Sequence, residues 1–565
     1  MLRGSGNSAA PYISSRPFNG YVGSSASFQL AGRWLVECSE GHEECRSLAG
    51  GFCPTRLVDL KRGLGLDFVK VVSSWSLRPT RETVYATLSY CWGGDQAIKT
   101  LRSTLQSHQA GIKISSLSQT LQDAIKVARS LRVEFLWIDS LCIVQDDPRD
   151  VTEEISRMSD YYENAFICIS AASASSCNEG FLQPRSGNPY HHGPFELPYR
   201  GPDNSMGSIK LVTYADYSSA LEPAKARAWI MQESLLAPRL LSYSYRNLAW
   251  SCRRVNCSDG GPYRPAHGWH DFKERENWRR SQREDAHSHE SFSIKYWKEL
   301  VQSYSRRGLT VPEDKFPALS AVAQKYAHTN SSLKYLAGLW HNTSHKCHPL
   351  FSQLFWTTPL YEFRFSHNLS FLGERYSRNL EAKSIHRSRG CLAPSWSWAA
   401  IDGPIIYEDW GDHMFEASNF KILDARVDAE IQQAPFGAVR SGWLTVKGGM
   451  REIVPSTEVA VLPSTEMVQP GVVYRPDSEE DNKDLYKIMN GRMQGWLLEV
   501  ASGGGNAKST TPHWNANMPK GLILVADRAD YRRIGLFSLE NERDSSFSNT
   551  DLSSYFGEPQ TITIV

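Results

Sequence analysis

The chain has 565 residues, which at about 150 residues per domain is enough for roughly three or four domains. Hydrophobic residues make up 41% and charged residues 22%, the composition of a globular protein, and the net charge of +1 argues against attraction of nucleic acid or an anionic membrane surface. No stretch approaches the roughly 20 apolar residues that span a bilayer, and the first residues lack the apolar core of a secretory signal. The sequence therefore predicts a cytoplasmic protein.

The first 81 residues are predicted to form a disordered terminus (1–30) and a lead-in segment (31–81). Most of the 11 cysteines stand singly in apolar stretches, which is typical of reduced, buried thiols rather than of a disulfide framework. The lead-in segment has two interpretations that the spacing leaves open. Its thiols are packed in a small helical element, or they bind zinc together with a histidine. The candidate ligands are Cys38, His42, Cys45 and Cys53.

Residues 54–172 contain apolar runs typical of strands that alternate with helical segments. Apolar positions in residues 117–131 recur at helical spacing, with Asp123 on the opposite, polar face. Ser116 and Gln119 have the spacing of a capping box at the start of this helix. Strands that alternate with helices predict a parallel sheet covered by helices. The predicted strands cover residues 54–60, 68–72, 85–92, 135–138 and 165–172.

Polar side chains follow the central apolar run, Phe135 to Ile138. In open parallel sheets, ligands bind outside the carboxyl ends of the strands, so this is a candidate site. Gly93 and Gly94 end the preceding strand and would let backbone amides approach a ligand closely. The polar residues that follow the central run include Asp139, Ser140, Cys142, Gln145 and Asp146.

The rest of the chain is predicted in three parts. A helix begins near Pro223 and is ended by Pro238, with Trp229 and Glu233 on one face, and a hairpin follows at residues 240–252. Residues 241–410 are mixed and mainly helical, with a solvated insertion at 258–295. Residues 411–565 contain short strands separated by turns and predict a β-rich accessory region.

Four stretches resemble the HET (heterokaryon incompatibility) domain of filamentous fungi in sequence, order and spacing. These stretches place the domain at residues 82–240. Val151 stands where the family commonly has Trp, which affects the packing of that loop. The stretches are Tyr85-Ala-Thr-Leu-Ser-Tyr-Cys-Trp-Gly93, Leu136-Trp-Ile-Asp-Ser-Leu-Cys-Ile-Val-Gln-Asp146, Met158-Ser-Asp-Tyr-Tyr-Glu-Asn-Ala165 and Arg227-Ala-Trp-Ile-Met-Gln-Glu233.

The resemblance implies that the protein functions in self/non-self recognition between fungal cells and in programmed cell death, as a form of innate immunity. HET domains have been suggested to be distant relatives of TIR-like domains, which have a flavodoxin-like fold and in some members hydrolyse NAD with a glutamate in a Trp-x-x-x-Glu helix. By this analogy Glu233 is the catalytic carboxylate and Asp139 supports it, with NAD as substrate and neither a cofactor nor a metal required. The implied substrate-binding residues are Ser89, Trp92, Gly93, Gly94, Cys142, Gln145, Asp146, Arg227, Trp229 and Gln232.

Two functional hypotheses follow from different classes of protein. In the first, the domain is an NAD glycohydrolase that acts when partners bring copies together. In the second, it is a non-catalytic signalling module that docks other incompatibility or cell-death proteins. Structural interpretations compete with the catalytic ones, because Glu233 can pair with Arg227 or Arg239 and Asp139 can accept hydrogen bonds from loop amides.

Overall fold

The computed structural model divides into two compact units, residues 1–279 and 280–565, each with its own core. Parts of the predicted disordered terminus (1–30) lie outside the described residues. The structure describes residues 7–9, 11–12, 19–45, 52–61, 65–77, 83–184, 195–211, 222–245, 247–262, 273–281, 290–342, 349–358, 385–390, 393–407, 414–455, 460–461, 467–469, 472–503, 518–539 and 555–565.

Unit 1 is built on one mixed sheet. Its centre is parallel, as predicted, but antiparallel strands extend it on both sides. The predicted hairpin at residues 240–252 is confirmed as β9 and β10. In spatial order the strands are β12 (Gly261–Pro262), β11 (Asn256–Ser258), β10 (Leu248–Cys252), β9 (Arg239–Tyr243), β6 (Ile167–Ser170), β3 (Tyr85–Ser89), β5 (Phe135–Trp137), β1 (Arg56–Asp59), β2 (Phe68–Ser73) and β4 (Ile112–Lys113).

The four parallel strands β5, β3, β6 and β9 form the core of unit 1. They are buried on both faces, which explains why their sequences are continuous apolar runs without alternation. Counted along the chain, their spatial order is second, first, third, fourth. The order therefore reverses at β3, which pairs with β5 on one side and with β6 on the other.

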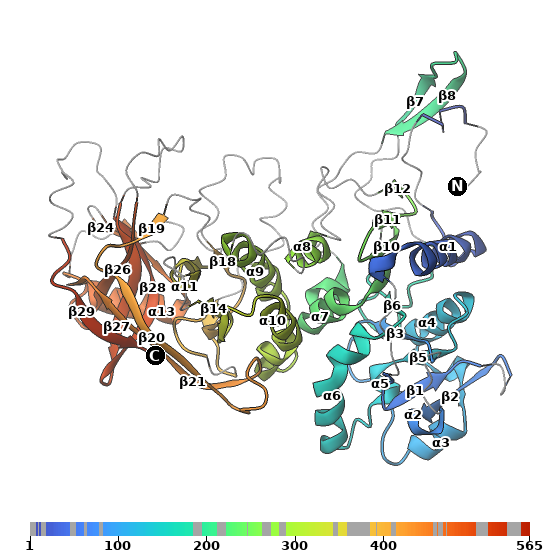
Figure 1. The fold of residues 1–565 in the computed structure, drawn as a ribbon, viewed down its shortest axis with the longest axis horizontal. Helices are drawn as coiled ribbons and strands as arrows, with labels where there is room; N and C mark the ends of the chain where they lie inside the picture. The colour runs from blue at the N-terminus through green and yellow to red at the C-terminus, as the bar shows by residue number, and fades with distance from the viewer. Residues whose placement is uncertain are drawn as a thin grey trace. The chain divides into compact units, whose positions relative to one another are not determined.

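Helices cover both faces of this sheet. Figure 1 shows α1 and α4 on one side and α6 and α7 on the other, and α7 packs on β3 and β6. Helix α1 begins at Ser25, before the expected start of the lead-in segment at residue 31. The helices of unit 1 are α1 (Ser25–Gly41), α2 (Ser74–Leu77), α3 (Leu105–Ala110), α4 (Gln119–Ser130), α5 (Asp139–Cys142), α6 (Pro148–Glu163), α7 (Ala228–Leu236) and α8 (Lys273–Ser281).

Two details of α4 differ from the sequence prediction. Ser118 is the N-cap residue, because Ser116 lies in a short 3-10 turn that precedes the helix. Asp123 is buried instead of facing solvent. Its Oδ2 accepts hydrogen bonds from the backbone amides of Phe181 and Leu182 at 2.8 and 3.0 Å, which satisfies two buried donors of the loop after β6.

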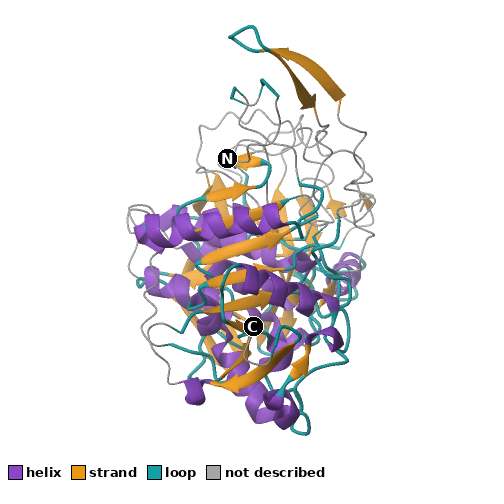
Figure 2. Cartoon of the chain, turned by 90° about the vertical axis from the view of Figure 1, so that its right-hand side faces the viewer, coloured by secondary structure: helices purple, strands orange, loops and turns teal. Residues whose placement is uncertain are grey.

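The remaining parts of unit 1 are a hairpin and a packed helix. The hairpin pairs β7 (Phe195–Arg200) with β8 (Met206–Leu211) and stands apart from the sheet (Figure 2). Helix α8 lies within the predicted solvated insertion, yet Arg275 is buried and donates to Ser251 Oγ and Ala237 O at 2.9 Å each. Within the described part of the chain, no helix has the length and apolar character to cross a bilayer.

Unit 2 has the β-rich carboxyl end that the sequence predicts. Strands are present within residues 411–565, as expected, and they pair mainly with antiparallel neighbours. The strands of this sheet are β19 (Met414–Glu416), β20 (Lys421–Ala429), β21 (Val439–Gly448), β22 (Met450–Glu452), β23 (Ala460–Val461), β24 (Met467–Gln469), β25 (Val472–Pro476), β26 (Trp496–Gly503), β27 (Lys520–Asp527), β28 (Asp530–Leu539) and β29 (Gln560–Ile564).

Helices and short strand pairs complete unit 2. Within residues 241–410, which are expected to be mainly helical, the longest helices of this unit are α9 and α10. These elements are α9 (Glu290–Ser305), α10 (Pro317–Thr329), α11 (Pro349–Gln353) and α13 (Glu479–Met489), with β13 (Lys334–Leu336), β14 (Leu339–His341), β15 (Trp356–Thr357), β16 (His386–Arg387), β17 (Ile401–Asp402) and β18 (Ile406–Tyr407).

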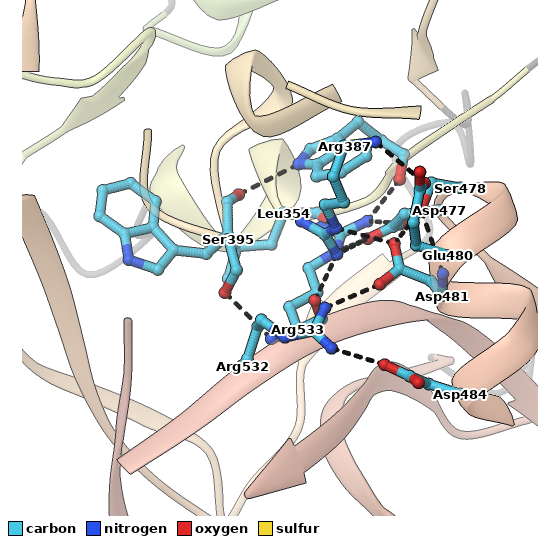
Figure 3. A network of polar contacts seen from close by, with 12 residues as sticks. Leu354, Arg387, Ser395, Asp477, Ser478, Glu480, Asp481, Asp484, Arg532 and Arg533 are labelled. Carbon is cyan, nitrogen blue, oxygen red and sulfur yellow. Dashed lines mark hydrogen bonds and ion pairs between the residues drawn. The ribbon is translucent and has the colours of Figure 1, made fainter. Parts of the chain in front are cut away.

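A buried ionic network joins α13 to β28 (Figure 3). Arg533 forms a two-pronged ion pair with Asp477, with N···O distances of 2.8 and 3.0 Å, and both side chains are fully buried. The Arg533 guanidinium also donates to the carbonyl of Trp356 at 2.7 Å and lies over the indole ring at 3.6 Å. Because every prong of this guanidinium has an acceptor, the buried charge is compensated.

Candidate functional site

The candidate site is built at the carboxyl ends of the parallel strands in unit 1. Ser89 at the end of β3 pairs in register with Ser170 at the end of β6. Asp139 lies two residues beyond the last residue of β5 and begins the short helix α5. Because β3, β5 and β6 are parallel, these side chains lie at one edge of the sheet.

Helix α7 carries the second carboxylate to this edge. Nearly every side of this helix is apolar and buried, so it packs directly on the sheet, and Pro238 prevents its continuation. Ile230 packs with Cys91, Ala172 and Ala224, which lie beyond β3 and β6 or in the turn before α7. Glu233 follows one turn later and is only 7% exposed.

Asp139 is held by donors from two directions. Its Oδ2 accepts a hydrogen bond from the indole Nε1 of Trp92 at 2.8 Å, and its Oδ1 accepts from the backbone amide of Ser140 at 2.7 Å. The side-chain amide of Gln145 donates to the backbone carbonyl of Asp139 at 3.0 Å. These bonds fix the position of the carboxylate after β5.

The two carboxyl groups are close enough to influence each other. Burial raises the pKa of Glu233 to about 7; Ser89 and Arg227 act in the opposite direction, and the Asp139 charge raises the pKa further. Burial also raises the pKa of Asp139, and the hydrogen bond from Trp92 opposes this effect. The buried Glu233, beside the half-buried Asp139, can therefore hold a proton near neutral pH.

Arg227 supplies the positive charge beside this pair. Its Nη1 donates to the backbone carbonyl of Tyr90 at 3.0 Å, which fixes the guanidinium at the end of β3. Arg227 lowers the pKa of both Glu233 and Asp139. Arg239, the other predicted partner of Glu233, instead donates to the carbonyls of Phe166 and Cys45 at 3.0 and 2.5 Å.

The remaining predicted residues of α7 occupy different environments. Trp229 is half-buried and packs against the core of unit 1. Gln232 is buried, and its Oε1 has no hydrogen-bond partner within the described residues. An unpaired buried acceptor is costly, so a ligand hydroxyl or amide that reached Gln232 would relieve that cost.

Other predicted site residues lie outside the cluster formed by Ser89, Trp92, Asp139, Arg227 and Glu233. Cys142 is fully buried, burial raises the pKa of its thiol to about 12, and its carbonyl accepts from Arg56 at 2.5 Å. The Oδ1 of Asp146 accepts from the backbone amide of Arg102 at 2.7 Å. Cys142 and Asp146 thus have structural contacts of their own.

The two glycines after β3 differ in their surroundings. Gly93 has a φ of +71°, and a Cβ added there would lie 2.1 Å from Cβ of Ser176, so only glycine fits against the loop after β6. Gly94, with a φ of +126°, is exposed and faces open space. Close packing of the loops therefore accounts for Gly93.

The structure adds two tyrosines that the sequence prediction did not include. Tyr90 is buried, donates to Ser140 Oγ at 3.0 Å and accepts from Gln96 Nε2 at 2.7 Å. Tyr162 on α6 donates to the carbonyl of Leu88 at 3.1 Å and lowers the pKa of Glu233. In the sequence, Tyr90 can be recognised as a site candidate because it directly follows Ser89 at a strand end. Tyr162 cannot, because it fits an ordinary apolar helix face.

A scan of the sequence against protein families matches residues 85–233 to the family described as Heterokaryon incompatibility protein (HET). The chain carries a HET domain. The matched range begins with β3 and ends at Glu233, so it contains the parallel strands β3, β5 and β6, Asp139 and most of α7. This match associates the chain with heterokaryon incompatibility.

The HET domain match covers only part of unit 1. The flanking strands β1, β2, β9 and β10 lie outside it, although they belong to the same sheet. Searches among curated proteins and solved structures found no match. The assignment to the HET family therefore depends on the match at residues 85–233 and on the sequence and structure of this chain.

Proposed function

We propose that the HET domain acts in self/non-self recognition and programmed cell death by hydrolysing NAD, with Glu233 as the catalytic carboxylate and Asp139 in support. The observation that carries the proposal is the meeting of Glu233, Asp139 and Arg227 at the carboxyl ends of β3 and β5. That edge lies where the strand order reverses, which is the usual ligand site of open parallel sheets.

The order of the parallel strands supports a TIR-like, flavodoxin-like domain. Flavodoxin-like sheets have the order 2-1-3-4-5, and β5, β3, β6 and β9 follow the first four positions of that order. The Trp229-x-x-x-Glu233 segment forms a helix over the strand ends, as the analogy with NAD-hydrolysing TIR-like domains requires. The strand order and the position of this helix both support the analogy, and the side chains must supply the chemistry.

The proposed reaction converts NAD and water into nicotinamide and ADP-ribose. The bond between the ribose carbon and the pyridinium nitrogen breaks, and its electron pair leaves with neutral nicotinamide. The ribose becomes an oxocarbenium-like cation, which the ionised carboxylate of Glu233 stabilises while it hydrogen-bonds the hydroxyls. Water then adds to the carbon and gives its proton to a carboxylate. In this proposal Arg227 attracts the diphosphate, and Trp92 or Trp229 stacks on a ring.

The restricted access to Glu233 gives a reason for the activity of such an enzyme to be controlled. The side chain is 7% exposed because α7, which carries it, packs on the sheet, so ribose hydroxyls reach it only when α7 and the strand-end loops separate. We propose that association with other incompatibility or cell-death proteins, or with further copies of the chain, favours this opening in the cytoplasm.

The test is NAD turnover by the purified full-length protein, measured as released nicotinamide with and without enforced clustering. Glu233→Gln should lower turnover by about 10²–10⁴-fold, because it removes the charge that stabilises the transition state. Glu153→Gln on the exposed side of α6 is the matched control and should leave turnover unchanged. Turnover that survives Glu233→Gln in folded protein would remove Glu233 from the mechanism.

The second candidate function is a non-catalytic docking module. The observation that favours it is that both oxygens of Asp139 already have donors in the folded chain, from Trp92 and Ser140. In that case the clustered wild-type protein releases no nicotinamide. Cell death in a fungal expression assay would then be the same for wild type and Glu233→Gln.

A further inference from the structure

Three thiols and one imidazole from distant parts of unit 1 converge beside the sheet. Cys38 lies in the last turn of α1, His42 directly follows that helix, and Cys45 ends the short 3-10 helix Glu43–Cys45. Cys252 is the last residue of β10. Their sulfur and ring-nitrogen atoms all lie within 4.8 Å of one another.

The distances agree with a single ion at the centre of the four side chains. Zinc binds sulfur at about 2.3 Å and imidazole nitrogen at about 2.0–2.1 Å, so a tetrahedral site separates S and N ligands by about 3.6 Å and S ligands by about 3.8 Å. Nδ1 of His42 lies 3.5 Å from Sγ of Cys252 and 3.9 Å from Sγ of Cys45. The four ligand atoms thus already surround one position.

The surroundings favour thiolate ligands. The backbone amide of Val255 donates to Sγ of Cys252 at 3.4 Å, a contact that stabilises a thiolate at this position. Nη1 of Arg253 donates to the backbone carbonyl of Glu44 at 3.2 Å, so a side-chain hydrogen bond also joins the two ligand-bearing segments. Backbone donors to sulfur are the outer contacts that orient metal ligands.

Other buried cysteines of unit 1 lie apart from this group. Cys91, Cys142 and Cys168 are buried, and none of them belongs to it. Cys53, the fourth ligand expected from the sequence, is not part of the group, and its place is taken by Cys252, which is 210 residues from His42. The spacing of Cys38, His42 and Cys45 in the sequence predicts three members of this group, whereas the fold is what brings Cys252 beside them.

We propose that Cys38, His42, Cys45 and Cys252 bind one Zn²⁺ ion in a closed Cys₃His site. Four protein ligands leave no open position, so the ion is structural and not catalytic. It links α1 to β10, segments that precede and follow the matched HET range of residues 85–233. The site thereby fastens the two flanks of the HET domain into one folded unit, independently of NAD hydrolysis.

The experiment measures metal in the full-length protein purified without chelators. Elemental analysis should find about one zinc per wild-type chain, and replacement by Co²⁺ should give the sulfur-to-metal charge-transfer and d–d absorption of a tetrahedral thiolate site. Cys252→Ser should lose the zinc. Cys53→Ser, which removes a thiol of the lead-in segment that is not part of the group, should retain it. His42→Cys should also retain zinc, with a Co²⁺ spectrum shifted toward that of four thiolates.

The wild-type measurements keep the proposal testable if Cys252→Ser fails to fold. Folded wild-type protein that takes up neither zinc nor cobalt would overturn it, as would full zinc content in folded Cys252→Ser. Thiol titration under denaturing conditions adds a further check. A disulfide between any two of the three cysteines in freshly purified protein would contradict the site.

Discussion

Replacing the buried acid of α7 should change the pH dependence of folding as well as catalysis. Glu233→Gln keeps the shape of the side chain and removes its charge. In the folded protein burial raises the pKa of Glu233 from an ordinary 4.5 to about 7. The folded state therefore holds a proton that the unfolded chain releases between pH 4.5 and 7, and ionised Glu233 opposes folding above that range.

The size of this effect follows from the change in pKa. At about 1.4 kcal/mol for each tenfold change in an equilibrium constant, the rise to about 7 corresponds to an upper figure of about 3 kcal/mol. This cost is absent below about pH 4.5 and complete above about pH 7. Glu233→Gln should therefore match wild type near the acidic limit and exceed it in stability by up to this amount at about pH 8.

The assay is urea unfolding of the full-length protein, followed by tryptophan fluorescence at several pH values. The difference in midpoint between Glu233→Gln and wild type should grow as the pH rises through the range from 4.5 to about 7. Glu153→Gln, an exposed change on α6, should show no such growth. A difference that is constant with pH would refute the reasoning, since it would mean that Glu233 titrates alike in the folded and unfolded chain.

Two further predictions concern packing and buried charge. Asp477→Ala should destabilise unit 2 by about 3–5 kcal/mol in thermal unfolding, because it leaves the Arg533 guanidinium buried without its carboxylate; a change below about 1 kcal/mol would contradict the buried pair. Gly93→Ala should lower the melting temperature, because the new methyl group meets Ser176 and the left-handed backbone is strained, whereas Gly32→Ala in α1, where the space is open, should raise stability by about 0.5–1 kcal/mol. Equal effects of the two alanines would contradict this packing.

Local sequence signals were sufficient to predict much of the HET domain. The apolar run from Phe135 to Ile138 predicts a strand because its burial on both faces requires apolar residues at every position. The spacing of Trp229 and Glu233 predicts one helix, and α7 contains both residues. The carboxyl ends of parallel strands share an edge, which is why the predicted pair of Asp139 and Glu233 lies together.

Features that depend on distant partners were beyond local signals. Asp123 was expected on the solvent face of α4, but amides from the loop after β6 needed an acceptor there. Cys252 replaced Cys53 in the thiol group because β10 pairs beside β9 and ends near α1, a consequence of sheet order. The sequence predicts Cys142 at the site, but in the structure its side chain is fully buried in the core of unit 1.

The most direct test of the account is the pH–rate profile of NAD cleavage by the clustered full-length protein. If ionised Glu233 stabilises the transition state, the rate of nicotinamide release should rise with pH through an apparent pKa near 7 and become level above it. Absence of turnover, or a rate that does not change between about pH 5.5 and 8.5, would contradict the central claim that the buried carboxyl pair at the strand ends performs chemistry.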